Sequence, residues 1–357
     1  MKNNKGITLV ALVVTIVVLL ILAGVSINLV LGDNGIIAKA QEAKTKSAEA
    51  SQNDVTSMDE LAKELEDAIN GTGNTDDDSK FMKENTKVTY SDGDVWIPEG
   101  FKIADDSAST VQGGVVIEDK DGNQFVWVPV ATIADYKRTA YTGEDIIEDY
   151  TETLPEDERT SVDTYKGFYI GRYEAGDKES TEAKTLRSSN DVTKTVTIKA
   201  NQSPYNYVTS TQAISLAEGF KTQQGYKAKT KLVSSYAWDT TIAFLQKVNS
   251  DYESSSEEGN YIDTTFLYTD ITGASQTKEE NLDVLVPTGQ TTTVCNIYDM
   301  GGNVWEWTTE SCSHMDNPYT IRGGDSNDNF AIYPAGNRDD DSGNANVDIG
   351  FRLTLFM

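Results

Sequence analysis

An uncharged apolar run opens the chain. Between Ile7 and Gly32 no side chain is charged, and a helix of about 25 residues is long enough to cross the roughly 30 Å hydrocarbon core of a bilayer. Two lysines precede the run and Asp33 is the first acid after it; this asymmetry places the short N-terminal end in the cytoplasm and the rest outside. The pattern predicts one transmembrane helix over residues 7–32. A secretory signal peptide cleaved near Ala23 is the alternative.

A second helical pattern follows a glycine-containing turn. Residues 33–70 are rich in Ala, Glu and Lys, and their apolar positions are three or four apart, as on one face of a helix: Val55, Met58, Leu61, Leu65 and Ile69. We expect a helical stalk there. Residues 71–87 begin with a polar, glycine-containing stretch that is typical of a linker.

From about residue 88 the apolar positions form short runs between turns. Residues 115–117 and 125–128 flank Asp121-Gly122, which predicts a hairpin. Residues 167–173 are a further strand candidate.

Helical spacing returns twice, near residues 209–220 and 234–248. The acidic stretch 144–158 and the Ser/Glu-rich stretch 251–258 are predicted to be solvated loops. The fold class is therefore α+β, with N-terminal helices and then a domain of short strands and two helices over residues 88–357.

Composition narrows the possible partners. The formal net charge is −27 with a sequence pI near 4.3, so the surface repels phosphate backbones and no nucleic acid is expected as a partner. Cations such as calcium are attracted instead. A single histidine, His314, excludes most histidine-based metal and acid–base chemistry, and two cysteines make no disulfide framework.

The start of the apolar run resembles the processing site of type IV prepilins in the sequence Lys5-Gly6-Ile7-Thr8-Leu9-Val10. The resemblance implies a leader over residues 1–6, cleavage after Gly6 and methylation of Ile7. It also implies a bacterial protein, anchored by one membrane pass with its C-terminal domain extracellular or in a pilus, whose partners are the membrane and other pilin subunits. Ala11 stands where the family usually has glutamate, which favours a minor or tip subunit over a major one.

The C-terminal part resembles the formylglycine-generating enzyme family, a variant of the C-type lectin fold. The matching blocks occur in the family's order: Phe168 to Glu174, Leu232 to Asp239, Gly302 to Trp307, Arg322-Gly323-Gly324 and Gly350-Phe351-Arg352. The resemblance implies an irregular domain with short strands. From the residues themselves, Trp305 and Trp307 are expected in the core, and Arg322, Arg338 and Arg352 are expected to hold backbone carbonyls.

The oxidising enzymes of that family carry a reactive cysteine pair after the Arg-Gly-Gly block. Residues 325–349 contain no cysteine here, so we expect a protein that is not an enzyme. Cys295 and Cys312 lie on either side of the Trp-Glu-Trp block and form either a disulfide or two free thiols.

The resemblance also implies one calcium ion at the Trp-Glu-Trp turn, bound by Asp299, Gly302, Val304 and Glu306. Oxygen donors from a tight glycine turn suit such a hard cation. The alternative is that Glu306 only hydrogen-bonds nearby backbone amides.

Residues 325–348, here called the C-terminal segment, are predicted to contact a ligand. About half of them are Asn, Asp or Ser, a composition typical of adaptable binding loops. Some relatives have this segment rewritten by a diversity-generating retroelement; an ordinary solvated loop is the alternative. The predicted ligand-binding residues are Asp325, Asn327, Asn329, Phe330, Ile332, Tyr333, Asn337, Asp339, Asp340, Asn344 and Asn346.

The function predicted from these features is a non-catalytic, surface-displayed binding module on a pilin-type anchor, with a glycan, protein or cell surface as ligand. Two alternatives stay open. One is a structural pseudopilin of a secretion or uptake apparatus, and the other is an anchored enzyme of the formylglycine-generating superfamily with unknown chemistry.

Overall fold

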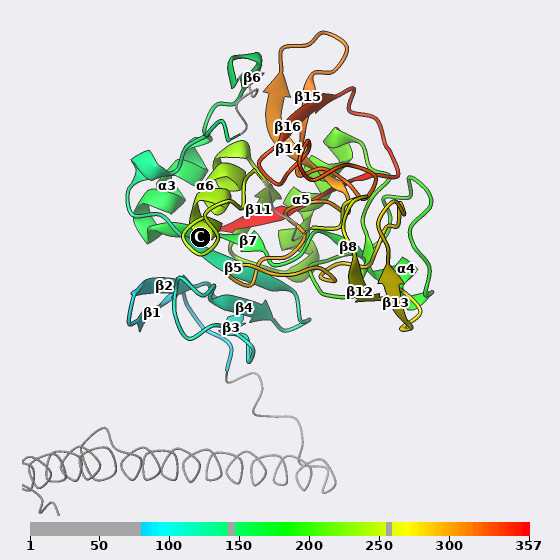
Figure 1. The fold of residues 1–357 in the computed structure, drawn as a ribbon. Coiled ribbons are helices and arrows are strands. Elements are labelled where there is room, and N and C mark those ends of the chain that lie inside the picture. The colour runs from blue at the N-terminus through cyan, green and yellow to red at the C-terminus, as the bar shows by residue number, and fades with distance from the viewer. Residues whose placement is uncertain (1–79, 142–146, 255–258) are drawn as a thin grey trace, which may run out of the picture. The chain divides into compact units, whose positions relative to one another are not determined.

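The computed structural model describes residues 80–141, 147–254 and 259–357 (Figure 1). The predicted leader (1–6), transmembrane helix (7–32), stalk (33–70) and first part of the linker lie outside the described residues. Among the helices within the described ranges, none is long and apolar enough to cross a membrane.

A six-stranded antiparallel sheet forms one half of the domain, with the order β11-β18-β7-β5-β4-β3. Its strands are β3 (Phe101–Ile103), β4 (Val116–Asp119), β5 (Gln124–Pro129), β7 (Gly167–Gly171), β11 (Lys229–Leu232) and β18 (Leu353–Phe356). The predicted hairpin is confirmed as β4–β5, and Gly122 at its turn has a φ of +81°, which a glycine adopts without strain. The predicted strand over 167–173 is confirmed as β7.

A second sheet is built around β14 (Trp305–Cys312). β15 (Tyr319–Arg322) pairs with β14 antiparallel, β16 (Arg338–Asp341) pairs with β15, β17 (Ile349–Phe351) pairs with β14 parallel, and β6 (Tyr150–Thr151) pairs with its far end. Only Arg352 separates β17 from β18 of the six-stranded sheet. The chain therefore passes directly from one sheet to the other at this arginine.

Three small sheets complete the strands that the structure describes. They are β1–β2 (Thr86–Tyr90, Gly93–Ile97), β10-β8-β9 (Ser203–Pro204, Gly176–Asp177, Val196–Thr197) and β12–β13 (Phe266–Thr269, Ser275–Lys278). Among the described residues the folded unit begins at Lys80, earlier than the predicted boundary at 88. Met82 exchanges backbone hydrogen bonds with Phe101 and Gly100, so the last predicted linker residues belong to the folded unit.

Four α-helices lie within the described residues: α3 (Glu156–Tyr165), α4 (Lys178–Glu182), α5 (Ser210–Gln224) and α6 (Ser235–Leu245). The two predicted helices are confirmed as α5 and α6. A capping box on Thr209 begins α5 and the left-handed Gly225 ends it. The Ser234 side chain accepts from the Ala237 amide at the start of α6.

The prediction that residues 144–158 form a solvated loop is wrong over their described part. This part contains β6 and the first turn of α3, and Glu158 is buried. Its carboxylate accepts from the Tyr136 hydroxyl at 3.0 Å and lies 3.3 Å from the Lys231 ammonium. Because an acid can be buried when it is paired, composition alone was a poor guide here.

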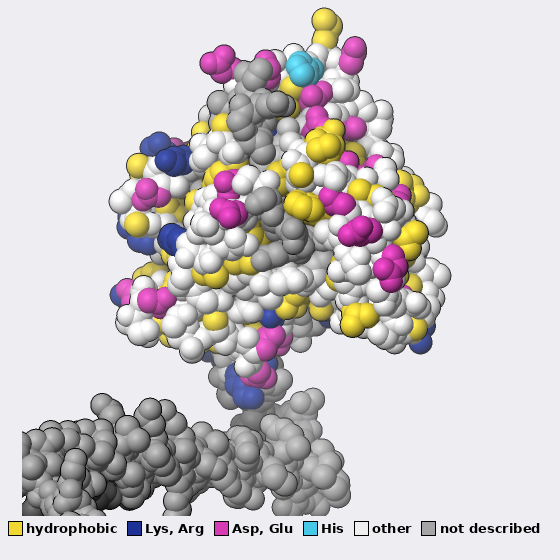
Figure 2. All heavy atoms as spheres, viewed as in Figure 1, with side chains coloured by type: hydrophobic (Ala, Val, Ile, Leu, Met, Phe, Trp, Pro, Cys, Tyr) yellow, Lys and Arg dark blue, Asp and Glu magenta, His cyan; other side chains and the backbone are white. Residues whose placement is uncertain are grey.

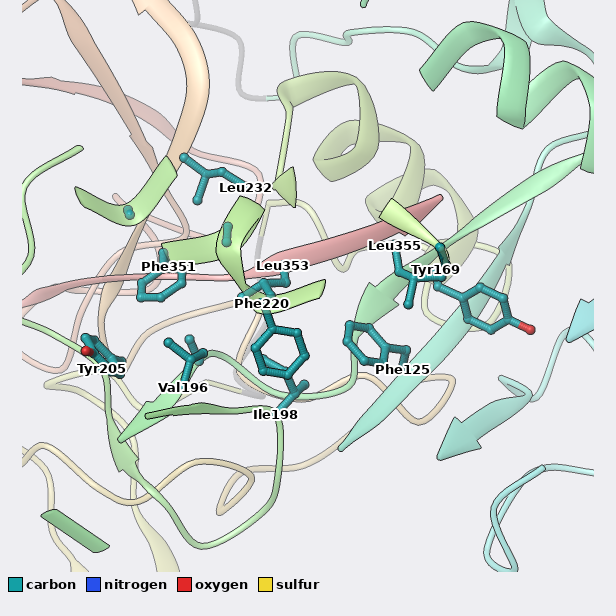
Figure 3. Packing of buried hydrophobic residues seen from close by; sticks show 14 of the residues in the cluster. Phe125, Tyr169, Val196, Ile198, Tyr205, Phe220, Leu232, Phe351, Leu353 and Leu355 are labelled. Carbon is teal, nitrogen blue, oxygen red and sulfur yellow. The ribbon is translucent and has the colours of Figure 1, made fainter. Parts of the chain in front are cut away.

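The hydrophobic core lies between the sheets and helices. Figure 3 shows side chains from α5, β5, β7, β17 and β18 meeting there, among them Phe125, Phe220, Phe351 and Leu355. Trp305 and Trp307 are 6% and 0% exposed, so their predicted place in the core is confirmed.

Candidate functional site

The C-terminal segment rests on a buried cluster of two arginines and two acids. Arg322 of β15 and Arg338 of β16 are side by side in the sheet register. Asp239 of α6 accepts from both, with its two carboxylate oxygens 2.7 Å and 2.8 Å from their Nη2 atoms. Glu310 of β14 accepts from Arg338 Nε at 2.6 Å. All four side chains are fully buried.

Charge compensation sets the ionisation of this cluster. Burial lowers the pKa of Arg322, and its neighbour Arg338 lowers it further. Burial raises the pKa of Glu310, but Arg338 and Arg322 outweigh that and hold it below its usual range. Glu310 therefore stays charged and keeps the Arg338 guanidinium in place.

Arg322 also fixes the backbone of the C-terminal segment. Its Nε donates to the Asn337 carbonyl at 2.7 Å and its Nη2 to the Gly336 carbonyl at 3.1 Å. The prediction that the arginines hold irregular backbone is therefore confirmed at this position.

The segment's own short polar side chains form its turns. The carboxylate of Asp325 accepts from the Asn327 amide at 2.8 Å, and the Asn329 side chain accepts from the Ala331 amide at 2.9 Å. Asp341 accepts from the Gly343 amide at 2.7 Å in the same way. Such bonds define the loop backbone without help from exposed side chains.

The structure divides the predicted ligand-binding residues into three groups by exposure. Asp325 is only 5% exposed and its carboxylate turns inward to bond the Asn327 amide, so its role as a ligand contact stays a prediction. Ile332 is 62% exposed, and the amides Asn327, Asn344 and Asn346 are exposed with it. The remaining residues are half-buried: Asn329, Phe330, Tyr333, Asn337, Asp339 and Asp340.

The two aromatic residues of the segment also pack inward. The Tyr333 ring lies edge-on to Trp305 with centroids 5.6 Å apart, and the Phe330 ring lies 6.3 Å from that of Tyr261. Both rings therefore contribute to the scaffold as well as to the surface.

A small acidic pocket of about 260 Å³ opens beside the segment. Its lining includes the carboxyl groups of Asp283, Asp325 and Asp348, together with Ser326 and Asn327. Burial, and then the neighbouring Asp328 carboxyl, raise the pKa of Asp325 to about 7. Sequence reasoning missed Asp283, and it did not name Asp348 although that residue ends the predicted segment, because nothing in the local pattern shows that the fold brings the two acids to Asp325.

The predicted calcium ligands lie around one turn, but other groups occupy their oxygens. Arg352 donates to both carboxylate oxygens of Glu306, from Nη2 at 2.7 Å and from Nε at 3.0 Å and 3.1 Å. Asp299 accepts from the Gly289 amide at 2.7 Å. A guanidinium directed at the same oxygens fits poorly with a bound cation, so these donors do not suit calcium as they stand. The calcium site, which includes the carbonyls of Gly302 and Val304, stays a prediction.

Sequence reasoning also missed Glu174 beside this turn. It is fully buried, and its Oε1 accepts from Asn303 Nδ2 at 2.5 Å, whereas Oε2 has no hydrogen-bond partner among the described residues. Burial and then the charge of Asp299 raise the pKa of Glu174 well above its usual value. Three acids thus lie near the single Arg352, and the raised pKa of Glu174 favours its neutral form among them.

The two cysteines are free thiols in the described structure, so the disulfide alternative is not borne out. Cys295 packs in the cluster around Trp238, where Gln112 Nε2 lies 3.7 Å from its sulfur. Cys312 ends β14 in the other sheet. Burial raises the pKa of Cys295 to about 11, so this thiol is protonated and a poor nucleophile near neutral pH.

Comparisons with known proteins give one family and a set of similar structures. The model of the sulfatase-modifying factor enzyme 1-like domain (FGE-sulfatase) matches residues 149–355. No curated protein matches the chain.

Solved structures similar to this chain include PvdO from Pseudomonas aeruginosa, with 17% identity, a TM-score of 0.39, and 68% of this chain and 98% of that one covered. CarF has 15% identity and a TM-score of 0.39, with 65% and 98% covered. Treponema denticola variable protein 1 has 13% identity and a TM-score of 0.39, with 66% and 96% covered.

Replacing Asp239 with alanine should destabilise the domain strongly. The change leaves Arg322 and Arg338 buried without their shared carboxylate, which costs about 3–5 kcal/mol of unfolding free energy. Urea denaturation of the full chain measures it. The control is Asp163→Ala on α3, whose side chain is 57% exposed and ion-paired with Lys166 at the surface. Equal stability of the two variants would contradict the assigned role of Asp239.

Asp325→Asn should change how stability depends on pH. The carboxyl of Asp325 titrates near 7 in the folded state and near 4 when unfolded. The folded state holds the extra proton between these values, so the wild type loses stability as pH rises through that range, by about 1.4 kcal/mol for each pKa unit. The variant cannot ionise at this position. Its free energy of unfolding should therefore rise relative to that of the wild type as the pH increases from 4 to 8.

Urea denaturation at each pH tests this prediction, with Asp163→Asn as the exposed control. A constant difference between Asp325→Asn and wild type across the range would show that Asp325 ionises normally.

Proposed function

The chain belongs to the FGE-sulfatase family, whose model covers residues 149–355, and we propose that it uses this fold to bind an extracellular ligand through the C-terminal segment. It is not an enzyme in this proposal. A pilin-type N-terminal helix anchors it at the bacterial surface, where it is a minor or tip component.

The observation that carries the proposal is the separation of scaffold from surface at the C-terminal segment. On the buried side, Arg322 bonds the segment's backbone and is itself paired, together with Arg338, with Asp239. Within the loops, side chains such as that of Asp325 accept from backbone amides two residues further on. Asn327, Ile332, Asn344 and Asn346 project from that frame and are exposed. Exposed side chains that are restrained only by neighbours in the same loop are free to match a ligand.

Thiol chemistry favours binding over catalysis. The family's oxidising enzymes need a reactive cysteine pair after the Arg-Gly-Gly block, and residues 325–349 have no cysteine. Burial raises the pKa of both Cys295 and Cys312. Raised thiol pKa values oppose the thiolate state that such chemistry requires.

The side chains at the face point to a ligand with hydroxyl or amine groups. Acidic side chains gather over the upper part of the view in Figure 2, where Figure 1 places β15 and β16. Asp283 and Asp348 of the pocket accept hydrogen bonds when ionised, and Asn327 both donates and accepts. A glycan or a basic segment of a surface protein fits these groups, whereas a polyanion is repelled.

Removing the exposed side chains of the segment should abolish ligand binding without unfolding the domain. The test variant is Asn327→Ala, Ile332→Ala and Asn344→Ala combined in the full chain. It avoids Phe330 and Tyr333, because both pack on buried rings. Binding is measured on a glycan array and on intact bacterial and animal cells.

The matched control replaces three exposed residues of the β1–β2 hairpin, Lys87, Thr89 and Asp94, by alanine. We expect wild type and control to bind and the segment variant to lose at least about tenfold in affinity, the effect of losing 1.4 kcal/mol. Equal binding by all three proteins would place the ligand elsewhere. Binding by none would favour the pseudopilin alternative.

Processing of the N-terminus tests the anchor. Mass spectrometry of the mature protein should find Ile7 as its methylated first residue, and Gly6→Ala should leave the precursor uncut. Gly24→Ala, at the alternative signal-peptide site, is the control and should leave processing unchanged. A mature chain that starts between Ala23 and Ser26 would mean a secreted protein without this anchor.

A further inference from the structure

The only histidine of the chain lies against a cysteine and an aspartate. His314 Nδ1 is 3.0 Å from Asp340 Oδ1, and the Cys312 sulfur completes a group whose ligand atoms all lie within 4.8 Å of one another. Among the described residues, this is the group of three or more His, Cys, Asp and Glu side chains that comes close enough to hold a metal ion. Figure 2 shows the imidazole in cyan at the surface.

The strand register explains why these residues meet. Asp340 of β16 pairs with Thr320 of β15, and the Cys312 amide at the end of β14 donates to the Pro318 carbonyl of the adjacent strand. Residues opposite one another, and residues two apart along a strand, share a face of a sheet. Cys312, Thr320 and Asp340 therefore lie on one face, and the turn after β14 brings His314 over them.

A second observation on the same face is a buried polar group that lacks a hydrogen-bond partner. Thr320 is fully buried, yet its hydroxyl has no hydrogen-bond partner within the described residues. A buried hydroxyl without a partner is uncommon, because it forfeits the hydrogen bonds it had in water. A metal-bound water above Asp340 would give this hydroxyl a partner.

The turn that carries His314 is itself held in place. The Ser313 amide donates to the Asp149 carbonyl at 2.8 Å, and the Asn317 amide donates to the His314 carbonyl at 3.3 Å. His314 keeps a side chain that is 55% exposed. The backbone is thus fixed while the imidazole can rotate by the small amount that coordination requires.

We propose that Cys312, His314 and Asp340 bind a divalent transition-metal ion, with zinc as the preferred metal. One sulfur, one imidazole nitrogen and one carboxylate oxygen form a donor set that suits zinc and its neighbours in the first transition row, and not calcium, which takes oxygen ligands. Three protein ligands leave a fourth position of the tetrahedron open to solvent. On binding, the Cys312 thiol releases its proton to solvent and coordinates as thiolate.

Asp340 belongs to the C-terminal segment, so the metal site adjoins the proposed ligand-binding face. Metal binding is nevertheless measured independently of ligand binding. The metal would join the turn after β14 to β16 and would bring positive charge to an acidic end of the sheet. Met315 in that turn is 95% exposed, so this end of the sheet is open to solvent.

Cobalt binding tests the proposal directly. The reduced, metal-free full chain is titrated with Co²⁺, whose tetrahedral thiolate complex absorbs both in the visible and as a sulfur-to-metal charge-transfer band; Zn²⁺ is then added in competition. We expect one Co²⁺ per chain, displaced by one Zn²⁺. His314→Ala changes an exposed residue, so the fold should survive, and it should weaken zinc binding by at least about tenfold. Cys312→Ser should remove the charge-transfer band.

The matched control is Cys295→Ser, which changes the other buried cysteine and should leave the cobalt spectrum unchanged. A readout without cobalt is alkylation of Cys312 followed by mass spectrometry, in which zinc should protect the wild type but not His314→Ala. The proposal is overturned if no charge-transfer band appears, if the band is lost with Cys295→Ser instead, or if His314→Ala binds zinc as tightly as wild type. Loss of glycan or cell binding bears only on the function proposed above.

Discussion

Buried guanidinium groups hold this domain together, because much of its chain is loop and loops leave carbonyl groups without partners. Arg352 lies between β17 and β18 and donates to the Gly171 carbonyl of β7 at 2.9 Å, to the Asp299 carbonyl at 2.8 Å and to the Glu306 carboxylate. One side chain thus connects both sheets and the turn before β14. Burial without these partners would cost several kcal/mol. The arginine, its acid and the turn therefore depend on one another, which explains why the Trp-Glu-Trp and Gly-Phe-Arg blocks occur together.

Buried arginines paired with an acid also support the C-terminal segment, where Arg322 and Arg338 share Asp239. Here the charges stabilise a surface rather than a junction between sheets. Because backbone carbonyls of residues 336 and 337 receive the Arg322 hydrogen bonds, the loop conformation depends little on which side chains face outward. In the proposed function, stability and recognition therefore depend on different atoms of one segment.

Local patterns predicted what local interactions decide. Helices α5 and α6 follow from apolar spacing and from the caps at Thr209 and Ser234, and the β4–β5 hairpin follows from its Asp-Gly turn. The buried tryptophans could be predicted from their size and the glycines around them. These features need only neighbours in the sequence.

Features that depend on contacts between residues far apart in the sequence could not be predicted from local patterns. Glu158 looks like an exposed acid until Tyr136 and Lys231 are seen beside it. Counting one histidine and two cysteines made a histidine-based metal site look improbable, yet β14, β16 and the turn after β14 bring a cysteine, a histidine and an aspartate together. Asp325 was predicted as a ligand contact from the polar composition of its segment, and this composition did not show that the Asp325 side chain is buried and bonded to the Asn327 amide.

The attachment of the C-terminal segment at both ends has a consequence for its length. β15 before it and β17 after it both pair with β14, so the scaffold holds the two ends in adjacent strands whatever lies between. The entropy of closing a flexible loop rises only with the logarithm of its length, by about 0.6 kcal/mol for each doubling. Insertions at exposed positions of the segment, away from Arg338 and from the carbonyls of residues 336 and 337 that Arg322 holds, should therefore disturb folding little, and such positions are suited to carry grafted peptides of varied length.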